Sequence, residues 1–142
     1  LQEGIADYTG RTNHFIPFET VTLPEPKNTR NMDTATQKDA EGELIIKSLL
    51  PGDHVVLLDE KGEQLTSVEM SQWLERSLNL SAKRLVFVIG GPYGFADKIY
   101  KRADCKLSLS RLTFSHQMVR LIFTEQLYRA LTILKGMPYH HE

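Results

Sequence analysis

The spacing of apolar residues predicts a chain in which strands and helices alternate. Two short runs are apolar throughout, DHVVLLD at 53–59 and LVFVI at 85–89, which is typical of central strands in a parallel sheet. Residues 18–23 alternate and are rich in β-branched side chains, and residues 105–110 form a short alternating run. Both of these segments also favour strands.

Helical spacing of apolar residues is found between and around these runs. Residues 1–15 are expected to form the end of a helix, and another begins at Thr66, since TSVE at 66–69 has the pattern of a capping box. Turns are expected at Pro51-Gly52 and Lys61-Gly62. The remaining helices are expected at 34–50, about 95–103 and 116–135.

This alternation predicts the α/β class, with a mainly parallel sheet that carries helices on both faces, in one domain over residues 1–142. Ligands of such sheets bind beyond the carboxyl ends of the strands. The loops after Leu58, Ile89 and Leu109 are therefore the expected place of a site. The helix at 116–135 is apolar on most sides, so part of it is expected to form a dimer interface.

Composition narrows the class of protein. Of the 142 residues, 41% are hydrophobic and 25% are charged, as in ordinary globular proteins. The apolar runs are shorter than the roughly 20 residues of a membrane-spanning helix, and no signal-peptide pattern is visible. Cys105 is the single cysteine, which excludes an internal disulfide and favours a reducing, cytoplasmic setting.

Charge is divided unevenly along the chain. Residues 1–75 contain 6 Lys/Arg and 14 Asp/Glu, a net charge of −8, whereas residues 76–142 contain 11 and 4, a net charge of +7. A basic half suggests an anionic partner, but two oppositely charged halves also attract each other within one fold. The charges alone leave both interpretations open.

A bare loop, Gly90-Gly91-Pro92-Tyr93-Gly94, follows the second apolar run directly. Glycine adopts positive φ and allows a ligand to approach the main chain closely. The loop has neither the Gly-Lys-Ser/Thr of a Walker loop nor the G-x-G-x-x-G of a dinucleotide site. It either holds a ligand through main-chain groups or is a plain turn from strand to helix.

Two other segments carry candidate chemistry. LSLSRLTFSHQMVR, at 107–120, places small hydroxyl side chains between apolar ones, a pattern typical of a structured loop that offers backbone donors and acceptors. The last residues, GMPYHHE, place a tyrosine and two histidines beyond the last helix. Adjacent histidines lack the usual spacing of zinc ligands, so no metal site is expected.

These segments resemble one family along nearly the whole chain. VFVIGGPYGF, LSLSRLTFSHQMVR, EQLYRALTILKGMPYHHE and VVLLDEKG are similar, in content and order, to the RlmH-type enzymes of the SPOUT class. The resemblance implies a homodimer and an α/β fold with a C-terminal trefoil knot. It also implies transfer of a methyl group from S-adenosylmethionine to N3 of a pseudouridine in the large-subunit (23S) ribosomal RNA of the assembled ribosome.

The resemblance also assigns roles to residues. The cofactor would be held by Leu58, Gly90, Gly91 and a knotted loop formed by Ser110, Arg111, Leu112, Thr113, Phe114 and Ser115. Contacts with RNA would come from His116, Arg120 and His141, with Lys98, Lys101, Arg102 and Lys106 as further candidates for its backbone.

The implied reaction is an in-line displacement at the sulfonium methyl, which requires alignment of the base nitrogen rather than a metal. N3 must also lose its imide proton to a base or to water. Tyr139 and His140 are the expected catalytic residues at the substrate, and His140 is the better candidate for the base because an imidazole suits proton transfer near neutral pH. The resemblance further implies that the tail of one protomer completes the pocket of the other.

The sequence also departs from the family's pattern. Family members usually begin with a short strand that ends in glycine, whereas the residues numbered here begin with the following helix. Two other functions stay open: a non-catalytic module that binds a nucleotide-like ligand or RNA, and a SPOUT enzyme with another target such as transfer RNA. The YHH tail counts against the first, and the lack of an added RNA-binding domain in this sequence counts against the second.

Overall fold

The computed structural model describes residues 1–141, apart from the side chain of Thr29, so Glu142 of the predicted domain lies outside it. One sheet contains three parallel strands in the order β2-β1-β3. The strands are β1 (Asp53–Gln64), β2 (Arg84–Ile89) and β3 (Cys105–Ser108).

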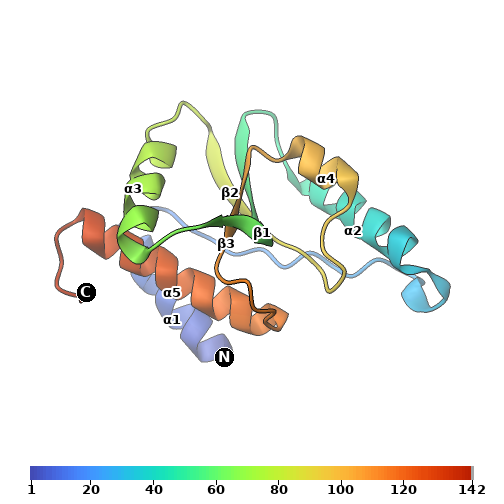
Figure 1. The fold of residues 1–142 in the computed structure, drawn as a ribbon, viewed down its shortest axis with the longest axis horizontal. Coiled ribbons are helices and arrows are strands. Elements are labelled where there is room, and N and C mark those ends of the chain that lie inside the picture. The colour runs from blue at the N-terminus through green and yellow to red at the C-terminus, as the bar shows by residue number, and fades with distance from the viewer. Residues whose placement is uncertain (142) are drawn as a thin grey trace.

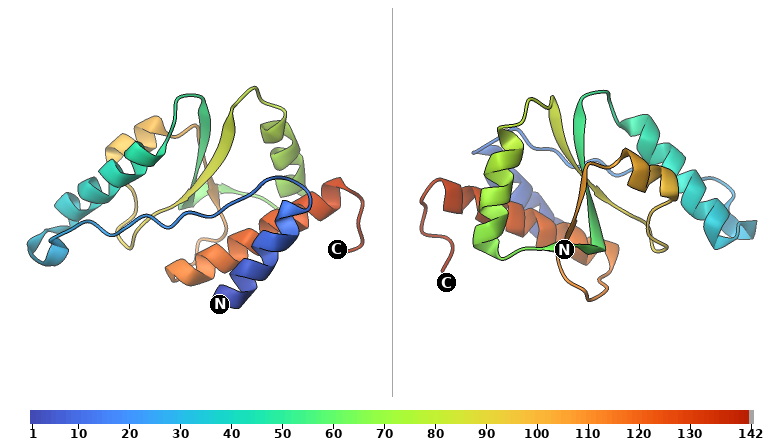
Figure 2. Two further views of the ribbon diagram at one scale, coloured as in Figure 1. Left: turned by 180° about the vertical axis from the view of Figure 1, so that it is seen from behind. Right: turned by 45° about the horizontal axis from the view of Figure 1, so that its top comes forward.

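Helices cover both faces of the sheet (Figures 1 and 2). On one face lie α2 (Thr34–Ser48) and α4 (Asp97–Arg102), and on the other lie α3 (Ser67–Leu78) and α5 (His116–Leu134). α1 (Gln2–Asn13) packs against α5, and a short 3-10 helix, Thr29–Asn31, precedes α2. The predicted α/β class, with a parallel sheet between helices, is confirmed.

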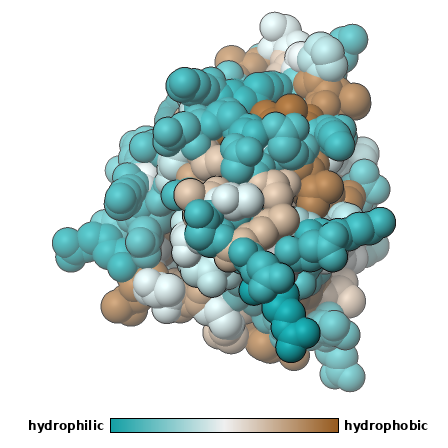
Figure 3. Space-filling view, turned by 90° about the vertical axis from the view of Figure 1, so that its right-hand side faces the viewer, coloured by the Kyte–Doolittle hydropathy of each residue, from teal (hydrophilic) through white to brown (hydrophobic). Residues whose placement is uncertain are grey.

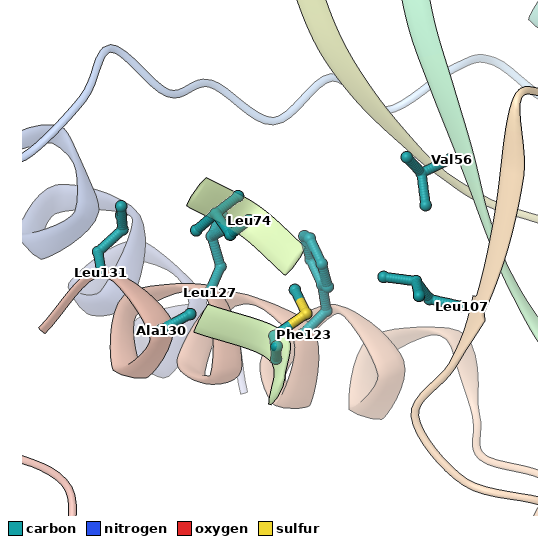
Figure 4. Packing of buried hydrophobic residues seen from close by; sticks show 8 residues of the cluster. Val56, Leu74, Leu107, Phe123, Leu127, Ala130 and Leu131 are labelled. Atoms are coloured by element: carbon teal, nitrogen blue, oxygen red, sulfur yellow. The ribbon is translucent and has the colours of Figure 1, made fainter. Parts of the chain in front are cut away.

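The side chains of β1 alternate between two cores. Val55 and Leu57 pack toward α2 and α4, in a cluster with Ile45, Phe95 and Ile99. Val56 faces the other way, toward α3 and α5 (Figure 4). Its cluster contains Met70, Leu74, Leu107, Phe123, Leu127, Ala130 and Leu131. Burial on both faces explains why this strand is apolar at consecutive positions.

Side chains cap the starts of α2, α3 and α5. The Thr66–Glu69 capping box is confirmed: the Glu69 N–H donates to Thr66 Oγ1 at 3.1 Å, and the Thr66 N–H donates to Glu69 Oε1 at 2.8 Å. Asp33 caps α2, and Ser115 caps α5 by accepting from the Met118 N–H at 3.4 Å. These short-range bonds satisfy N–H groups that a helix start leaves free.

The predicted strand at 18–23 is wrong. The segment is extended, but nothing in residues 1–141 pairs with it as a strand, and Val21 is 70% exposed. A strand needs a neighbour for its N–H and C=O groups. β-branched side chains favour the extended backbone but do not supply that neighbour.

Two further expectations about strands are corrected. β2, predicted to be central, lies at the edge of the sheet, and residues 85–89 are only half-buried. The turn expected at Lys61-Gly62 does not end β1. The Lys61 N–H does donate to Asp59 Oδ1 at 3.0 Å, but the strand continues, and its register with β3 shifts between Leu58 and Glu63.

The apolarity of α5 is largely satisfied within the chain, because α3 and α1 both pack against it (Figure 1). The contact with α1 is close: a Cβ on Gly4 would lie 2.9 Å from Leu121 Cδ1. The pattern of α5 therefore supports a dimer less strongly than the sequence suggested. None of the helices in residues 1–141 is both long and apolar enough to cross a membrane.

Candidate functional site

Two of the loops that were expected to hold a ligand, after Ile89 and Leu109, leave the same carboxyl-terminal end of the sheet, because its strands are parallel. The loop expected after Leu58 is absent, since β1 continues to Gln64. Leu58 of β1 pairs with Ile89 of β2 and with Leu107 of β3. Gly90 and Gly91 follow β2 directly, and residues 110–115 connect β3 to α5. The candidate cofactor residues therefore lie toward one end of the sheet, where the carboxyl ends of β2 and β3 meet Leu58 of β1.

The glycines of the loop at 90–94 have local packing roles. A Cβ on Gly90 would lie 2.9 Å from the ring of Phe95, and a Cβ on Gly91 would lie 2.2 Å from Glu41 Oε2. Gly94 has a φ of +81° and donates its N–H to the Gly91 carbonyl at 3.1 Å. Close packing and a tight turn thus explain some of the glycines in this loop. The space beside Gly94 is open.

Hydroxyl groups order the loop at 110–115. Ser110 Oγ accepts from the Leu112 N–H at 3.0 Å, and the Ser110 carbonyl accepts from Ser108 Oγ at 2.9 Å. Thr113 Oγ1 donates to Glu60 Oε2 at 3.3 Å, which ties this loop to the end of β1. Leu112 is 70% exposed, so the loop offers an apolar side chain at the surface.

A cavity of about 280 Å³ opens between the ends of β1 and β3 and the helices α3 and α5. Its lining is mostly apolar, with a few polar groups such as Glu63 and Gln126. Of the predicted cofactor residues, only Leu58 lines it. Ile122 and Gln126 could not be predicted from the sequence, because only the packing of α5 across the sheet brings them here.

Carboxylates gather at the same end of β1. The Tyr100 hydroxyl donates to Asp59 Oδ2 at 2.5 Å. Partial burial is the main cause that raises the pKa of Tyr100 to about 12, and the hydrogen bond with Asp59 is the second. Glu60 and Glu63 are exposed nearby. Apolar surface, main-chain groups and negative charge together suit a ligand with a flat ring system and a cationic centre.

The tail that carries Tyr139 and His140 lies at the opposite end of α5. The helix has 19 residues, and a helix of that length extends about 28 Å. Residues 110–115 precede its first turn and the tail follows its last (Figure 1). One chain therefore does not bring its own tail to its own cofactor loops.

Tyr139 is held against α5 and α1. Its hydroxyl donates to Glu125 Oε1 at 3.0 Å and lies 3.1 Å from the hydroxyl of Tyr8. Its ring meets Tyr128 edge to face, with 4.8 Å between the ring centroids. Burial, assisted by the bonds with Tyr8 and Glu125, raises the pKa of Tyr139 well above its usual value.

His140 contacts the same group of residues through Arg129. Arg129 Nη1 lies 3.0 Å from His140 Nδ1. The guanidinium also donates to Glu125 Oε1, from Nε at 3.1 Å and from Nη2 at 2.6 Å, and its carbon lies 4.8 Å from the Tyr139 ring centroid. We call Tyr8, Glu125, Arg129, Tyr139 and His140 the tail network.

No role was predicted from the sequence for Glu125, Arg129 or Tyr8. The spacing of Glu125 and Arg129, four residues apart on one helix, is a signal that could have paired them. Tyr8 was not accessible to such reasoning, because 131 residues separate it from Tyr139. His116 begins α5 and is exposed, Arg120 is half-buried in a groove beside α1, and His141 is exposed.

Several of the basic side chains proposed for RNA contacts are paired within the chain. Lys98 forms ion pairs with Asp39, at 2.8 Å, and with Glu43. Arg102 donates to the Asp53 carbonyl at 3.1 Å. The two halves of the chain thus do attract each other. Figure 3 shows a mainly hydrophilic face with small groups of apolar side chains.

Within residues 1–141 there is no group of three or more His, Cys, Asp or Glu residues that could hold a metal ion.

The chain is similar to known proteins over almost its entire length. The family described as "Predicted SPOUT methyltransferase" matches residues 1–140. A protein of Phocaeicola vulgatus named ribosomal RNA large subunit methyltransferase H is 62% identical over 138 residues, which cover 97% of this chain and 88% of the relative. Proteins with the same name are 57% identical in Parabacteroides distasonis, over 99% of this chain and 89% of the relative, and 52% identical in Cytophaga hutchinsonii, over 99% and 90%.

Proposed function

The chain belongs to the SPOUT methyltransferase family, and on this premise we propose that it methylates N3 of a pseudouridine in the 23S ribosomal RNA of the assembled ribosome. The observation that carries the proposal is the similarity of nearly the whole chain to relatives named ribosomal RNA large subunit methyltransferase H. The protein would act in the cytoplasm, as one domain over residues 1–142.

S-adenosylmethionine is the proposed cofactor, and it would supply a methyl group on a cationic sulfonium. The carboxyl-terminal end of the sheet suits such a molecule, because main-chain groups at Gly90, Gly91 and residues 110–115 can hold an adenine and a ribose. Leu58 would contact the adenine, and the carboxylates of Glu60 and Glu63 favour a cation nearby.

Two copies of the chain are proposed to form the complete site. Tyr139 and His140 contact Glu125 and Arg129, at and beyond the middle of α5, whereas the cofactor loops of their own chain lie before its first turn. In a homodimer, the tail of one protomer would reach the loops of its partner and place the target base in line with the methyl group. The site would then depend on assembly, because neither protomer alone holds all of its parts.

RNA is proposed to contact the side chains around these loops and the tail. His116, Arg120 and His141 are the candidates near the reacting base, and Lys101 and Lys106 are exposed and available to phosphates. Lys98 and Arg102 are weaker candidates, since carboxylates or carbonyls already engage them.

A transfer assay tests this function. The protein is mixed with methyl-labelled S-adenosylmethionine and ribosomes from cells that lack the endogenous enzyme, and the labelled nucleoside is identified by mass spectrometry. Label on a pseudouridine of 23S RNA is the expected result. Label on transfer RNA would instead favour a SPOUT enzyme with another target, and cofactor binding without any transfer would favour a non-catalytic module.

Substitution of the tail separates transfer from cofactor binding. Tyr139→Ala and His140→Ala should lower transfer by at least about 10²-fold while leaving the affinity for S-adenosylmethionine unchanged, because the tail is proposed to contact the target base and the loops to hold the cofactor. Full transfer activity in both variants would remove the tail from the proposed site.

A further inference from the structure

The tail network determines which hydrogen-bonding groups His140 can still offer. An arginine side chain has five N–H donors and no acceptor. Since Arg129 Nη1 lies 3.0 Å from His140 Nδ1, the imidazole nitrogen must accept in this bond. A neutral imidazole has one acceptor nitrogen and one N–H. With Nδ1 occupied as the acceptor, the ring proton lies on Nε2.

The hydroxyl group of Tyr139 is also engaged in hydrogen bonds within the chain. Glu125 is a carboxylate that only accepts, so the single hydroxyl proton of Tyr139 is donated to it at 3.0 Å. The hydroxyl of Tyr8, 3.1 Å away, is then the donor to Tyr139. The raised pKa of Tyr139 agrees with a phenol that keeps its proton. The nitrogen lone pair of His140 and the phenol of Tyr139 are thus both engaged within the chain.

We propose that His140 acts as a hydrogen-bond donor through Nε2, to a carbonyl oxygen of the target base, and that Arg129 and Glu125 are positioning residues that hold it in this tautomer. This inference rests on the proposed function. It assigns His140 a different part from the general base that its residue type alone suggests. The group that His140 would contact is an imide, in which a ring N–H lies between two carbonyl groups.

A donor at this place assists the reaction by stabilising charge. When N3 loses its proton to water, negative charge spreads onto the two neighbouring carbonyl oxygens. The N3 lone pair then forms the bond to the methyl carbon, and the carbon–sulfur bonding pair remains on sulfur as a neutral thioether. A preorganised N–H directed at one carbonyl oxygen lowers the energy of the charged imide.

Glu125 connects the parts of this arrangement. One of its oxygens accepts from Arg129 Nε and Nη2 and from the Tyr139 hydroxyl, and the other accepts from Gln126 Nε2 at 2.8 Å. The guanidinium is thereby fixed on one side by Glu125 and presents Nη1 to His140. If Glu125 or Arg129 is replaced, the aromatic contacts of Tyr139 should still hold the tail in place. His140 should then populate both neutral tautomers.

The tautomer is measured directly by nitrogen NMR of the full chain, without any substrate. Spectra of ¹⁵N-histidine-labelled protein are compared with those of His140→Gln to assign the ring among the 5 histidines. The expected result is a bare Nδ1 and a protonated Nε2 in the native protein, and a tautomer mixture in Arg129→Met. Arg76→Met, which removes an exposed cation on α3, is the matched control and should leave the spectrum unchanged. A proton on Nδ1 in the native protein overturns the proposal.

Transfer assays test the role of the donor. Glutamine has a side-chain N–H near the position of Nε2 but cannot accept a proton as a base. We expect His140→Ala to lower turnover by about 10²–10³-fold, as loss of one charge-stabilising donor does in other enzymes. His140→Gln should recover most of it, with the effect in kcat rather than in KM. A glutamine variant as inactive as the alanine variant contradicts the donor role.

The NMR spectrum tests the tautomer of His140, and the transfer assay of the native protein tests the proposed function separately. Native protein that fails to methylate ribosomes counts against the proposed function, whereas the NMR spectrum still decides the tautomer of His140. Neither the native spectrum nor the His140→Gln assay depends on the Arg129 variant folding.

Discussion

Gly62 shows how a single residue can be dictated by a contact that the local sequence does not reveal. Its position in Lys61-Gly62 suggested a turn, but the residue lies within β1 against the backbone of β3. A Cβ there would lie 2.7 Å from the carbonyl carbon of Leu107 and 2.8 Å from its nitrogen. Backbone atoms paired in a sheet cannot move aside as a flexible side chain can.

We therefore expect Gly62→Ala to lower the free energy of unfolding by about 1–3 kcal/mol, the usual cost of overpacking. Urea denaturation measures this change. Gly10→Ala is the matched control, because a Cβ at Gly10 meets nothing within 4 Å and alanine favours the helix. If both variants unfold at the same urea concentration, the close contact of β1 with β3 is not as described.

Asp53 is a second position where one side chain contributes to the stability of the fold. Its side chain is fully buried, and its carboxylate accepts from Arg84 Nε at 2.8 Å, from Arg84 Nη2 at 2.6 Å and from the Leu50 N–H at 2.7 Å. The hydrogen bonds from Arg84 lower the pKa of Asp53 below its usual value, despite the opposing effect of burial.

A depressed carboxyl pKa stabilises the fold above the unfolded value of about 3.9 and ceases to do so as the pH falls through the folded value. Asp53→Asn should therefore destabilise the protein by about 2–3 kcal/mol at neutral pH, the cost of lost charged hydrogen bonds. The difference should shrink below about pH 4. Urea midpoints at pH 7 and pH 3 measure it, and Asp7→Asn, in the exposed pair with Arg11, should change them little. A constant difference at both pH values would argue against the ion pair.

At the scale of elements, the end of α5 decides where the tail lies. Gly136 has a φ of +66°, and beyond it the Met137 N–H donates to the Thr132 carbonyl at 2.9 Å. This left-handed residue ends the helix and turns the chain back toward Glu125 and Arg129. The local signal is a glycine just after a helix, which the sequence does contain.

Gly136→Ala should displace the tail, because an L side chain in this conformation costs about 1–2 kcal/mol. We expect methyl transfer to fall several-fold with the affinity for S-adenosylmethionine unchanged, which a transfer assay and a cofactor titration measure together. Gly136→Asn is the control, since asparagine tolerates the left-handed region. Equal loss in both variants would mean that the glycine acts by something other than its backbone conformation.

Elements also differ in how far the sequence predicts them. The capping box at Thr66 was predictable, because its hydrogen bonds join residues three positions apart. The lack of a strand at 18–23 and the edge position of β2 were not predictable, since both depend on which segments lie alongside. Residues 18–23 have no strand partner in residues 1–141, and β2 lies at an edge.

At the scale of the whole molecule, the separation of tail and loops makes assembly part of the proposed function. A protomer with His140→Ala keeps its cofactor loops, and a protomer with Leu112→Arg keeps its tail. Leu112 is 70% exposed, so its substitution should spare the fold while blocking the cofactor loop. Cofactor titration establishes that block first; normal binding by Leu112→Arg would contradict the assignment of this loop.

Mixing the two inactive variants should restore transfer if one tail serves the other protomer's loops. In a two-fold dimer, random exchange would give about a quarter of the native number of complete sites. The measurement is a transfer assay after joint refolding, with each variant refolded alone as the control. No recovery, in mixtures shown to contain mixed dimers, would mean that each chain uses its own tail.

The α/β class, the strands at 53–59 and 85–89, the capping box at Thr66 and the family can all be inferred from the printed sequence, because they follow from apolar spacing, capping and long motifs that lie within single segments. Contacts in the folded chain place Tyr8, Glu125 and Arg129 around the tail, put β2 at the edge of the sheet, and hold the tail against α5 from its middle onward, away from the cofactor loops before its first turn. These features are contacts between residues far apart in the chain. Their geometry is set by how helices pack on the sheet, which no local pattern records.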